Sequence, residues 1–303
     1  MRIGNIKKGW RQLKALITGA SSGIGKEMAF YLASQGIDLI LVARRKGLLE
    51  DIKEKVSVNV QIIAMDLSVE RHLYKLHDKI KEENIDILIN NAGFGLFGLF
   101  HKTDLEREIE MIDLNVKAYH ILTKLFLQDF IKKDKGYILN VASSAGFLAG
   151  PRLSTYYATK NYVLKLTMAI NEELRQNKNN VVISALCPGP VATEFNRVAE
   201  GKFKTKGVSS KMVAKYAIDK MFKKKLIIIP EFNIKLGVFF SRFLPYRWML
   251  KKMYNFQKRK TDKRWYLFYF APKCKSASLW RSSGLFASFI DFSNIAYEFN
   301  KFK

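Results

Sequence analysis

Short apolar runs rich in β-branched residues alternate with longer amphipathic segments over the first 230 positions, and this alternation constrains the fold most strongly. Seven runs have the length and composition of strands: 15–18, 38–43, 60–65, 86–90, 136–142, 181–187 and 226–230. Several are apolar at consecutive positions, which is typical of parallel strands covered on both faces. Helical patterns fill the gaps, at 24–35, 47–56, 69–83, 104–132, 154–177 and 209–224. We therefore predict an α/β fold in which about seven strands form one doubly wound parallel sheet with helices on both faces.

The sequence pattern changes after residue 232. Residues 233–260 mix Lys and Arg with Phe, Leu, Tyr and Trp, as one or two amphipathic helices would, and residues 261–303 carry 12 aromatic residues without clear periodicity. We predict a sheet domain at 1–232, a basic amphipathic helical extension at 233–260 packed on or beside it, and a tail of unassigned structure at 261–303.

Positive charge is concentrated in the C-terminal third. The net charge is +25, and residues 201–303 hold 24 Lys and Arg against 5 Asp and Glu. Such a surface attracts nucleic acid, an anionic membrane or a phosphate-bearing substrate, and charge alone does not choose among them. The interleaved aromatic residues could stack on bases, but the sequence has no recognised nucleic-acid module, so we expect no nucleic acid as a partner.

The cysteine content and the longest uncharged segments bear on the compartment. Two cysteines, Cys187 and Cys274, are too few for a disulfide framework, and no Cys and His lie at metal-ligand spacing. Residues 1–14 lack the apolar core of a secretory signal, and long uncharged stretches such as 87–101 and 137–151 are shorter than the ~18 apolar residues of a membrane span. We expect a cytoplasmic protein, free or peripheral to a membrane, without a bound metal.

A glycine-rich loop follows the first predicted strand and opens a helix. It reads Thr18-Gly19-Ala20-Ser21-Ser22-Gly23-Ile24-Gly25. Glycines allow a tight turn and a close approach of the backbone to a pyrophosphate, whose charge is met by amides at the helix N-terminus. We predict dinucleotide contacts from Gly19, Ser21, Ser22, Gly23, Ile24 and Gly25. The alternative is a glycine-rich turn without a ligand.

The residues after the second predicted strand bear on the kind of dinucleotide. The sequence there is Ala43-Arg44-Arg45-Lys46, where a dinucleotide without a 2′-phosphate is usually held by an acidic residue. Because a guanidinium can bind a phosphate with two hydrogen bonds, Arg44 favours NADP(H), with Arg45 as a second candidate. Alternatively, this basic loop is only a solvated surface.

Polar residues also follow the third and fourth predicted strands. Asp66 and Leu67 follow the third strand, and Asn90-Asn91-Ala92-Gly93 ends the fourth. The carboxyl ends of strands form the binding crevice of an open α/β sheet, so we predict cofactor contacts from Asp66, Leu67, Asn91, Ala92 and Gly93. The asparagines could instead serve only to hold a turn together.

Ser143, Tyr156 and Lys160 form the most specific combination. Tyr156 and Lys160 are four apart on a predicted helix, so they share one face. A free tyrosine has a pKa near ~10, and lowering it by about 3 units requires roughly 4 kcal/mol of phenolate stabilisation, of the kind that an ammonium provides. Ser143 follows the fifth strand and could hydrogen bond to a substrate carbonyl. A tyrosine and a lysine at this spacing alone are most often a surface pair.

With these motifs in order, the sequence resembles the short-chain dehydrogenase/reductase family over about residues 10–230. The resemblance rests on residues 18–25, 90–93, Asn115, Ser143, Tyr156, Lys160 and 188–193. It implies a Rossmann-type fold in which Tyr156 exchanges a proton with the substrate oxygen, Lys160 lowers the tyrosine pKa and binds the nicotinamide ribose, and Ser143 orients the carbonyl. Asn115 would hold a water in a proton relay to Lys160.

The same resemblance implies a nicotinamide contact from the loop that follows the sixth strand. The residues concerned are Pro188, Gly189, Val191 and Thr193. After residue 232 the chain lacks the glycine-rich C-terminal strand of tetrameric members, which leaves a homodimer or a higher oligomer open. The basic stretch 223–260 is more similar to the 3-ketoacyl-CoA reductase and hydroxysteroid dehydrogenase subgroup than to the acyl-carrier-protein reductases.

We expect an NADP(H)-dependent oxidoreductase that transfers hydride between the nicotinamide and a ketone or secondary alcohol. The expected substrate is small and hydrophobic, or an acyl thioester such as a 3-oxoacyl thioester, or a steroid-like ketone. The alternative is a dinucleotide-sensing or membrane-recruited binding protein on the same fold, without turnover. The basic C-terminal third is expected to contact an anionic membrane or the phosphate of a substrate.

Overall fold

The computed structural model describes residues 13–195, 199 and 207–259. The chain divides into two units, Met1–Thr261 and Asp262–Lys303, and the second lies wholly outside the described residues, as does the predicted tail at 261–303. No helix in the described ranges is both long enough and apolar enough to cross a bilayer.

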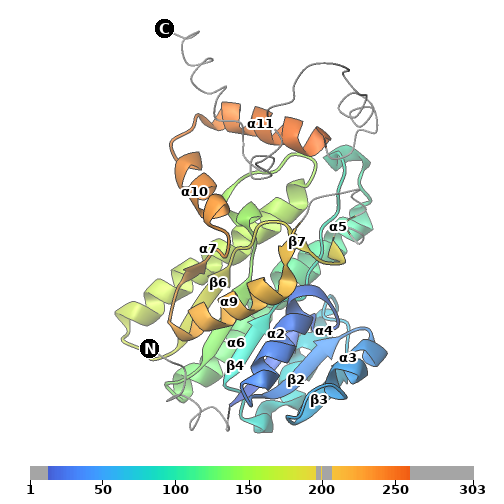
Figure 1. The fold of residues 1–303 in the computed structure, drawn as a ribbon, viewed down its shortest axis with the longest axis vertical. Helices are drawn as coiled ribbons and strands as arrows, with labels where there is room; N and C mark the ends of the chain where they lie inside the picture. The colour runs from blue at the N-terminus through green and yellow to red at the C-terminus, as the bar shows by residue number, and fades with distance from the viewer. Residues whose placement is uncertain (1–12, 196–198, 200–206, 260–303) are drawn as a thin grey trace, which may run out of the picture. The chain divides into compact units, whose positions relative to one another are not determined.

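A seven-stranded parallel sheet forms the centre of the first unit (Figure 1), as predicted. Its strands are β1 Lys14–Thr18, β2 Asp38–Ala43, β3 Val60–Ala64, β4 Ile87–Asn90, β5 Tyr137–Val141, β6 Val182–Leu186 and β9 Ile227–Ile228. They lie in the order β3-β2-β1-β4-β5-β6-β9. The chain leaves β1 for β2 on one side and enters β4 on the other, so the order reverses between β1 and β4. A crevice at the carboxyl ends of the strands is expected at such a reversal.

Helices cover both faces of the sheet. They are α2 Gly23–Ser34, α3 Lys46–Lys53, α4 Glu70–Lys79, α6 Ala118–Lys132, α7 Ser154–Gln176 and α9 Ser210–Phe222, whereas α5 Leu105–Ile112 packs on α7. One core cluster joins α2, α3 and α9 to the sheet, and a second cluster joins α4, α6 and α7 to the opposite face.

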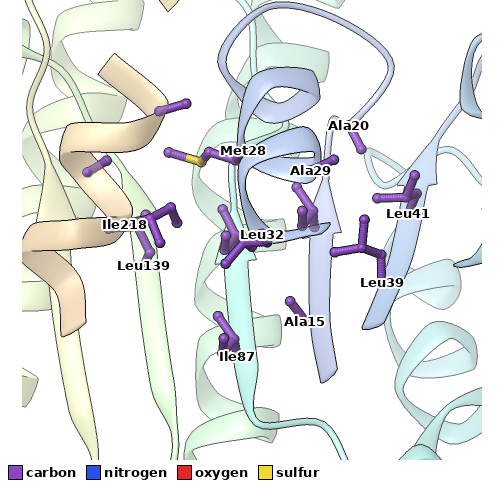
Figure 2. Close-up of a cluster of buried hydrophobic side chains, with 14 of the residues drawn as sticks. Ala15, Ala20, Met28, Ala29, Leu32, Leu39, Leu41, Ile87, Leu139 and Ile218 are labelled. Carbon is purple, nitrogen blue, oxygen red and sulfur yellow. The ribbon is translucent and has the colours of Figure 1, made fainter. Parts of the chain in front are cut away.

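Alternation of side chains along each strand supplies both core layers. In β2, Leu39 and Leu41 enter the first cluster, whereas Ile40 and Val42 enter the second. Figure 2 shows Leu32 of α2 close to the side chains of the central strands. Leu32 is fully buried, and a core Leu→Ala substitution costs about 2–5 kcal/mol.

The structure differs from the sequence-based prediction in two places near the crevice. The segment predicted as one helix, 104–132, is α5, a π-helical segment η4 at Asp113–Lys117, and α6. One wider turn leaves the apolar pattern nearly unchanged, so periodicity does not show it. The structure also contains a short parallel pair, β7 Val191–Ala192 and β8 Val208–Ser209, which was not predicted because two-residue strands have no pattern of their own.

Two further helices follow the sheet within the range predicted as the basic extension. They are α10 Phe232–Ser241 and α11 Tyr246–Arg259, coloured orange in Figure 1. At the start of α10, Glu231 accepts hydrogen bonds from Gly189 N, with both carboxylate oxygens at 3.2 Å. This contact fixes α10 to the loop that follows β6.

Candidate active site

A cavity of about 490 Å³ opens at the carboxyl ends of β1 to β6. Its volume lies within the range of small-molecule sites. Every predicted cofactor residue except Gly25 lines it: Gly19, Ser21, Ser22, Gly23, Ile24, Arg44, Asp66, Leu67, Asn91, Ala92, Gly93, Tyr156, Lys160, Pro188, Gly189, Val191 and Thr193. Ser143 lines it as well, so the structure brings the predicted motifs to one place.

The glycine loop is packed so closely that its glycine positions leave no space for a side chain. Gly19 and Gly23 have φ values of +64° and +57°, a region that favours glycine. A Cβ at Gly19 would lie 2.7 Å from Ala92 Cα, and one at Gly25 would overlap Asn91 Nδ2. The side chain of Ser22, the N-cap residue of α2, makes no capping hydrogen bond. The loop and the free amides of α2 therefore fit the pyrophosphate of a dinucleotide.

The two consecutive asparagines stabilise different parts of this region. Asn91 Nδ2 donates to Thr18 O at 3.0 Å and to Gly19 O at 3.1 Å, so it holds the glycine loop against β4. Asn90 Nδ2 lies within the sheet layer and donates to Asn140 Oδ1 at 2.9 Å. The side chain of Asn91 thus positions the loop, while its residue also lines the cavity.

The two arginines after β2 pair with carboxylates at the rim of the cavity. Arg44 Nη1 lies 3.1 Å from Glu110 Oε1 and 3.7 Å from Asp66 Oδ2, and its side chain is 58% exposed. Arg45 Nη2 lies 3.0 Å from Glu194 Oε2. Exposed ion pairs of this kind contribute about 0–1 kcal/mol each, so a phosphate can compete for either guanidinium.

The pKa of Asp66 reflects this pairing. Burial raises it, but hydrogen bonds from the backbone and side chain of Ser68, together with the charge of Arg44, lower the pKa below its ordinary value. Asp66 is therefore a carboxylate at neutral pH, and it accepts from Ser68 N at 2.9 Å. It stands at the end of β3, beside the guanidinium of Arg44.

Tyr156 and Lys160 project from α7 toward the end of β5. Lys160 is 4% exposed, and its Nζ donates to Val141 O at 2.9 Å. The same Nζ lies 5.9 Å from the ring centroid of Tyr156. Ser143 follows β5, accepts from Ala145 N at 3.1 Å and hydrogen bonds to the Tyr156 side chain. A proton donor, a buried amine and a hydroxyl therefore meet at one wall of the cavity.

Burial changes the pKa values of both groups on α7. It raises the pKa of Tyr156 to about 12, against the opposing effect of the Ser143 hydrogen bond. It also lowers the pKa of Lys160 to about 7. The pKa of Tyr156 is thus raised, opposite to the lowering expected from the lysine, because the loss of hydration outweighs the hydrogen bond with Ser143. A phenolate at pH 7 would require roughly 7 kcal/mol of stabilisation, at 1.36 kcal/mol for each pKa unit.

Asn115 lies in the π-helical segment η4 and is fully buried. Its Oδ1 accepts from Phe94 N at 3.1 Å, and its Nδ2 donates to Phe94 O at 2.8 Å and to Thr159 Oγ1 at 3.2 Å. The side chain does not line the cavity, because the backbone of Phe94 engages both ends of its amide. A Cβ at Gly93 would lie 2.7 Å from Asn115 Oδ1 and 3.5 Å from Lys160 Nζ, so these two groups meet across that glycine.

Two further residues of the site could not be predicted from the sequence. The Phe195 ring packs against the Tyr156 ring, with 5.2 Å between the ring centroids. Gln257 of α11 also lines the cavity, and its Nε2 donates to Tyr157 Oη at 3.1 Å. A single glutamine in a basic segment carries no motif, so only the packing of α11 reveals it.

The sequence is similar to those of known proteins. The family profile described as short chain dehydrogenase matches residues 13–202. The very-long-chain 3-oxoacyl-CoA reductase of Homo sapiens is 34% identical over 196 residues, which span 61% of this chain and 61% of that protein. The Mus musculus protein of the same name is 28% identical over 265 residues, covering 80% and 83%.

A solved structure extends the likeness to the whole fold. The short-chain dehydrogenase from Sphingobium yanoikuyae in complex with NADPH has a TM-score of 0.68 and 28% identity, covering 89% of this chain and 100% of that one. The profile spans more than half of the present sequence. The chain therefore belongs to the short-chain dehydrogenase/reductase family, as an oxidoreductase that acts between CH–OH and C=O groups with a nicotinamide dinucleotide.

Proposed function

We propose that the protein is an NADP(H)-dependent oxidoreductase for a ketone or secondary alcohol on a lipid-like substrate, such as a 3-oxoacyl thioester or a steroid-like ketone. The observation that carries this proposal is the meeting of Ser143, Tyr156 and Lys160 in a cavity that begins at the glycine loop. The bound dinucleotide would supply or accept the hydride.

The chain's own groups handle the proton. In the direction of reduction, the Tyr156 hydroxyl donates its proton to the substrate oxygen, and Ser143 hydrogen bonds to the same oxygen. The phenolate left behind is stabilised by the Lys160 ammonium, which needs to be protonated for this purpose. Because the pKa of Lys160 is about 7, its protonated fraction changes around neutral pH. Asn115 does not reach the substrate but positions the backbone of Phe94 through two hydrogen bonds.

Different parts of the cavity would hold different parts of the dinucleotide. The glycine loop and the N-terminus of α2 would hold the pyrophosphate, and Arg44, with Arg45 beside it, the 2′-phosphate. The residues at the ends of β3 and β4 would line the adenosine half, and the loop 188–193 the nicotinamide half. The preference for NADP(H) is supported by Arg44 and by the NADPH complex of the Sphingobium yanoikuyae relative.

Apolar side chains support a lipid-like substrate. Phe94, Leu153 and Phe195 line the cavity near Tyr156. Two relatives at about 30% identity are called very-long-chain 3-oxoacyl-CoA reductase. The aliphatic chain of such a substrate would therefore pack against apolar side chains beside the reacting carbonyl.

A substrate panel tests the proposal directly. Oxidation of NADPH and NADH is followed with 3-oxoacyl thioesters, a steroid ketone and a small aliphatic ketone. We expect turnover with NADPH and a thioester or steroid, and weaker use of NADH. If NADPH binds but no member of the panel is turned over, the alternative of a non-catalytic dinucleotide-sensing protein is favoured instead.

A second proposal concerns α10, which presents an exposed apolar stripe. The stripe consists of side chains that are 37–78% exposed: Phe232, Leu236 and Phe239 on α10, and Phe243 in the turn that follows it. The exposed cations Lys235, Arg242 and Arg247 stand beside them, and residues 232–259 contain no Asp or Glu. Phenylalanines flanked by cations bind anionic bilayer surfaces, where each Lys or Arg contributes about 1 kcal/mol. We propose that this accessory region, within 233–260, rests on an anionic membrane beside the catalytic domain 1–232.

Vesicle co-sedimentation tests the membrane proposal. The full chain should sediment with anionic vesicles at low salt, and the double variant Phe239→Ser/Phe243→Ser should sediment less. Phe100→Ser is the matched control, because Phe100 is 66% exposed but lies in the segment Phe100–Lys102, outside α10 and α11. Equal sedimentation of all three proteins, or none with anionic vesicles at any salt, would refute the proposal.

A further inference from the structure

Gln257 is a buried polar residue that the proposed proton transfer does not use. It lies on α11, is 1% exposed and lines the active-site cavity. Its Nε2 donates to Tyr157 Oη, but its Oε1 is buried and has no hydrogen-bond partner among the described residues. A buried acceptor without a hydrogen bond destabilises the fold, so a ligand that supplies a donor to it would be favoured.

The neighbours of Gln257 place it at the substrate end of the cavity. Tyr157, its hydrogen-bond partner, lies beside Tyr156, with 6.2 Å between the ring centroids. The glycine loop that fits the pyrophosphate is formed by β1 and α2, whereas Gln257 comes from the C-terminal helix α11. The free oxygen therefore lies close to the expected proton donor and on a different element from the dinucleotide cradle.

Tyr157 also lines a second cavity, of about 540 Å³, whose wall is largely apolar. It is bounded by Phe147, Leu148, Tyr246 and Leu250, among others, so α11 contributes to both cavities. Tyr157 lines both cavities, and the neutral Oε1 of Gln257 belongs to the side chain that hydrogen bonds to it in the first. An acceptor without a charge selects a neutral hydrogen-bond donor rather than a cation.

We propose that Gln257 is a substrate-recognition residue whose Oε1 accepts a hydrogen bond from an amide N–H of the substrate. Among lipid-like ketones, acyl thioesters of the pantetheine type carry such an amide a few bonds from the thioester sulfur, whereas simple ketones and esters do not. The inference rests on the proposed function and narrows its substrate class to amide-bearing thioesters.

Equilibrium binding tests this recognition without requiring turnover. The ligands are two 3-hydroxyacyl thioesters with the same acyl chain, one of N-acetylcysteamine, which carries an amide N–H, and one of pentanethiol, which does not. Calorimetry is carried out on the full chain with NADPH present, because the reduced dinucleotide and a hydroxyacyl thioester cannot react with each other. We expect the wild type to bind the amide-bearing thioester about 2- to 12-fold more tightly, the range for one net hydrogen bond of 0.5–1.5 kcal/mol.

Two variants separate recognition from a structural role. Gln257→Leu should bind both thioesters equally, whereas Gln257→Glu retains an acceptor and should retain the preference. The NADP⁺ affinity and unfolding midpoint of both variants verify that the fold is intact. A preference that survives in Gln257→Leu, an equal loss of both ligands, or the absence of any preference in the wild type would overturn the proposal.

The same two thioesters distinguish a failure of the proposed reaction from a failure of recognition by Gln257. If the wild type discriminates between the two thioesters but turns over neither 3-oxo analogue with NADPH, recognition by Gln257 stands and the proposed reaction does not. If it turns over both analogues equally well and binds both equally, the reaction stands and the recognition by Gln257 is refuted.

Discussion

Replacing Gly25 by alanine tests whether the glycine loop is a close-packed cradle held in place by Asn91. A Cβ at this position would overlap Asn91 Nδ2 and would lie 2.6 Å from Gly19 O. The Asn91 side chain would have to move and would lose its hydrogen bonds to Thr18 O and Gly19 O.

The expected cost follows from these contacts. Two lost hydrogen bonds cost about 1–3 kcal/mol in total, and the remaining overlap with Gly19 O costs roughly another 1–3 kcal/mol. The higher helix propensity of alanine offsets about 0.5–1 kcal/mol of this loss in stability, since Gly25 lies in α2. We expect a net destabilisation of about 1–5 kcal/mol, together with weaker dinucleotide binding, because the amides of the loop lose their alignment.

Urea unfolding and titration with NADPH measure both effects. Gly47→Ala is the matched control, because Gly47 lies in α3 and a Cβ there would meet nothing within 4 Å. It should be stabilised by about 0.5–1 kcal/mol and should bind NADPH normally. In the double variant Gly25→Ala/Asn91→Ala, part of the overlap is relieved, so its loss of stability should be smaller than the sum of the single losses.

Two results would refute this reasoning. One is a Gly25→Ala protein as stable and as competent in NADPH binding as Gly47→Ala. The other is strict additivity in the double variant, which would mean that Gly25 and Asn91 do not share a contact.

The remaining predictions concern the rim arginine and the buried lysine. Arg44→Ala should reduce the ratio of NADPH affinity to NADH affinity. Glu110→Gln frees Arg44 from an ion pair and should increase this ratio by about 1.4- to 5-fold. Fluorescence titration with both dinucleotides measures the ratio, and an unchanged ratio in both variants would refute the role of Arg44. Burial lowers the pKa of Lys160 from 10.5 to about 7, so between these values the unfolded chain binds more protons and stability should rise with pH. Between pH 7 and pH 9, the free energy of unfolding measured in urea should therefore rise by up to about 1.4 kcal/mol per pH unit more in the wild type than in Lys160→Met. A difference between the two proteins that stays constant with pH would contradict the lowered pKa of Lys160.

The pattern of apolar residues was sufficient to predict the sheet and its helices. Strands such as β2 are apolar throughout and are bounded by polar loops, so their limits follow from local sequence. The motifs could be placed at the carboxyl ends of strands for the same reason. The strand pair β7–β8 and the π-helical segment η4 could not be predicted, because they depend on tertiary contacts and on one wider helical turn.

Side-chain roles were harder to predict than positions. From sequence alone, the asparagines could contact a ligand or stabilise a turn. In the structure, the side-chain amide of Asn91 hydrogen bonds to the backbone of the glycine loop. The direction of the pKa shift at Tyr156 depends on burial, which no spacing reveals. Gln257 enters the cavity only because α11 folds back over α7 to reach Tyr157, 100 residues earlier in the chain.

The central claim is that Tyr156 donates the proton, and the substitution Tyr156→Phe tests it most directly. Tyr162→Phe is the matched control, because Tyr162 lies on the same helix but is 39% exposed, with its hydroxyl on His120. With NADPH and whichever ketone is turned over best, Tyr156→Phe should lower kcat by about 10²- to 10⁴-fold and leave NADPH affinity nearly unchanged, and Tyr162→Phe should behave as the wild type. A Tyr156→Phe protein with kcat close to that of the wild type would contradict the assignment.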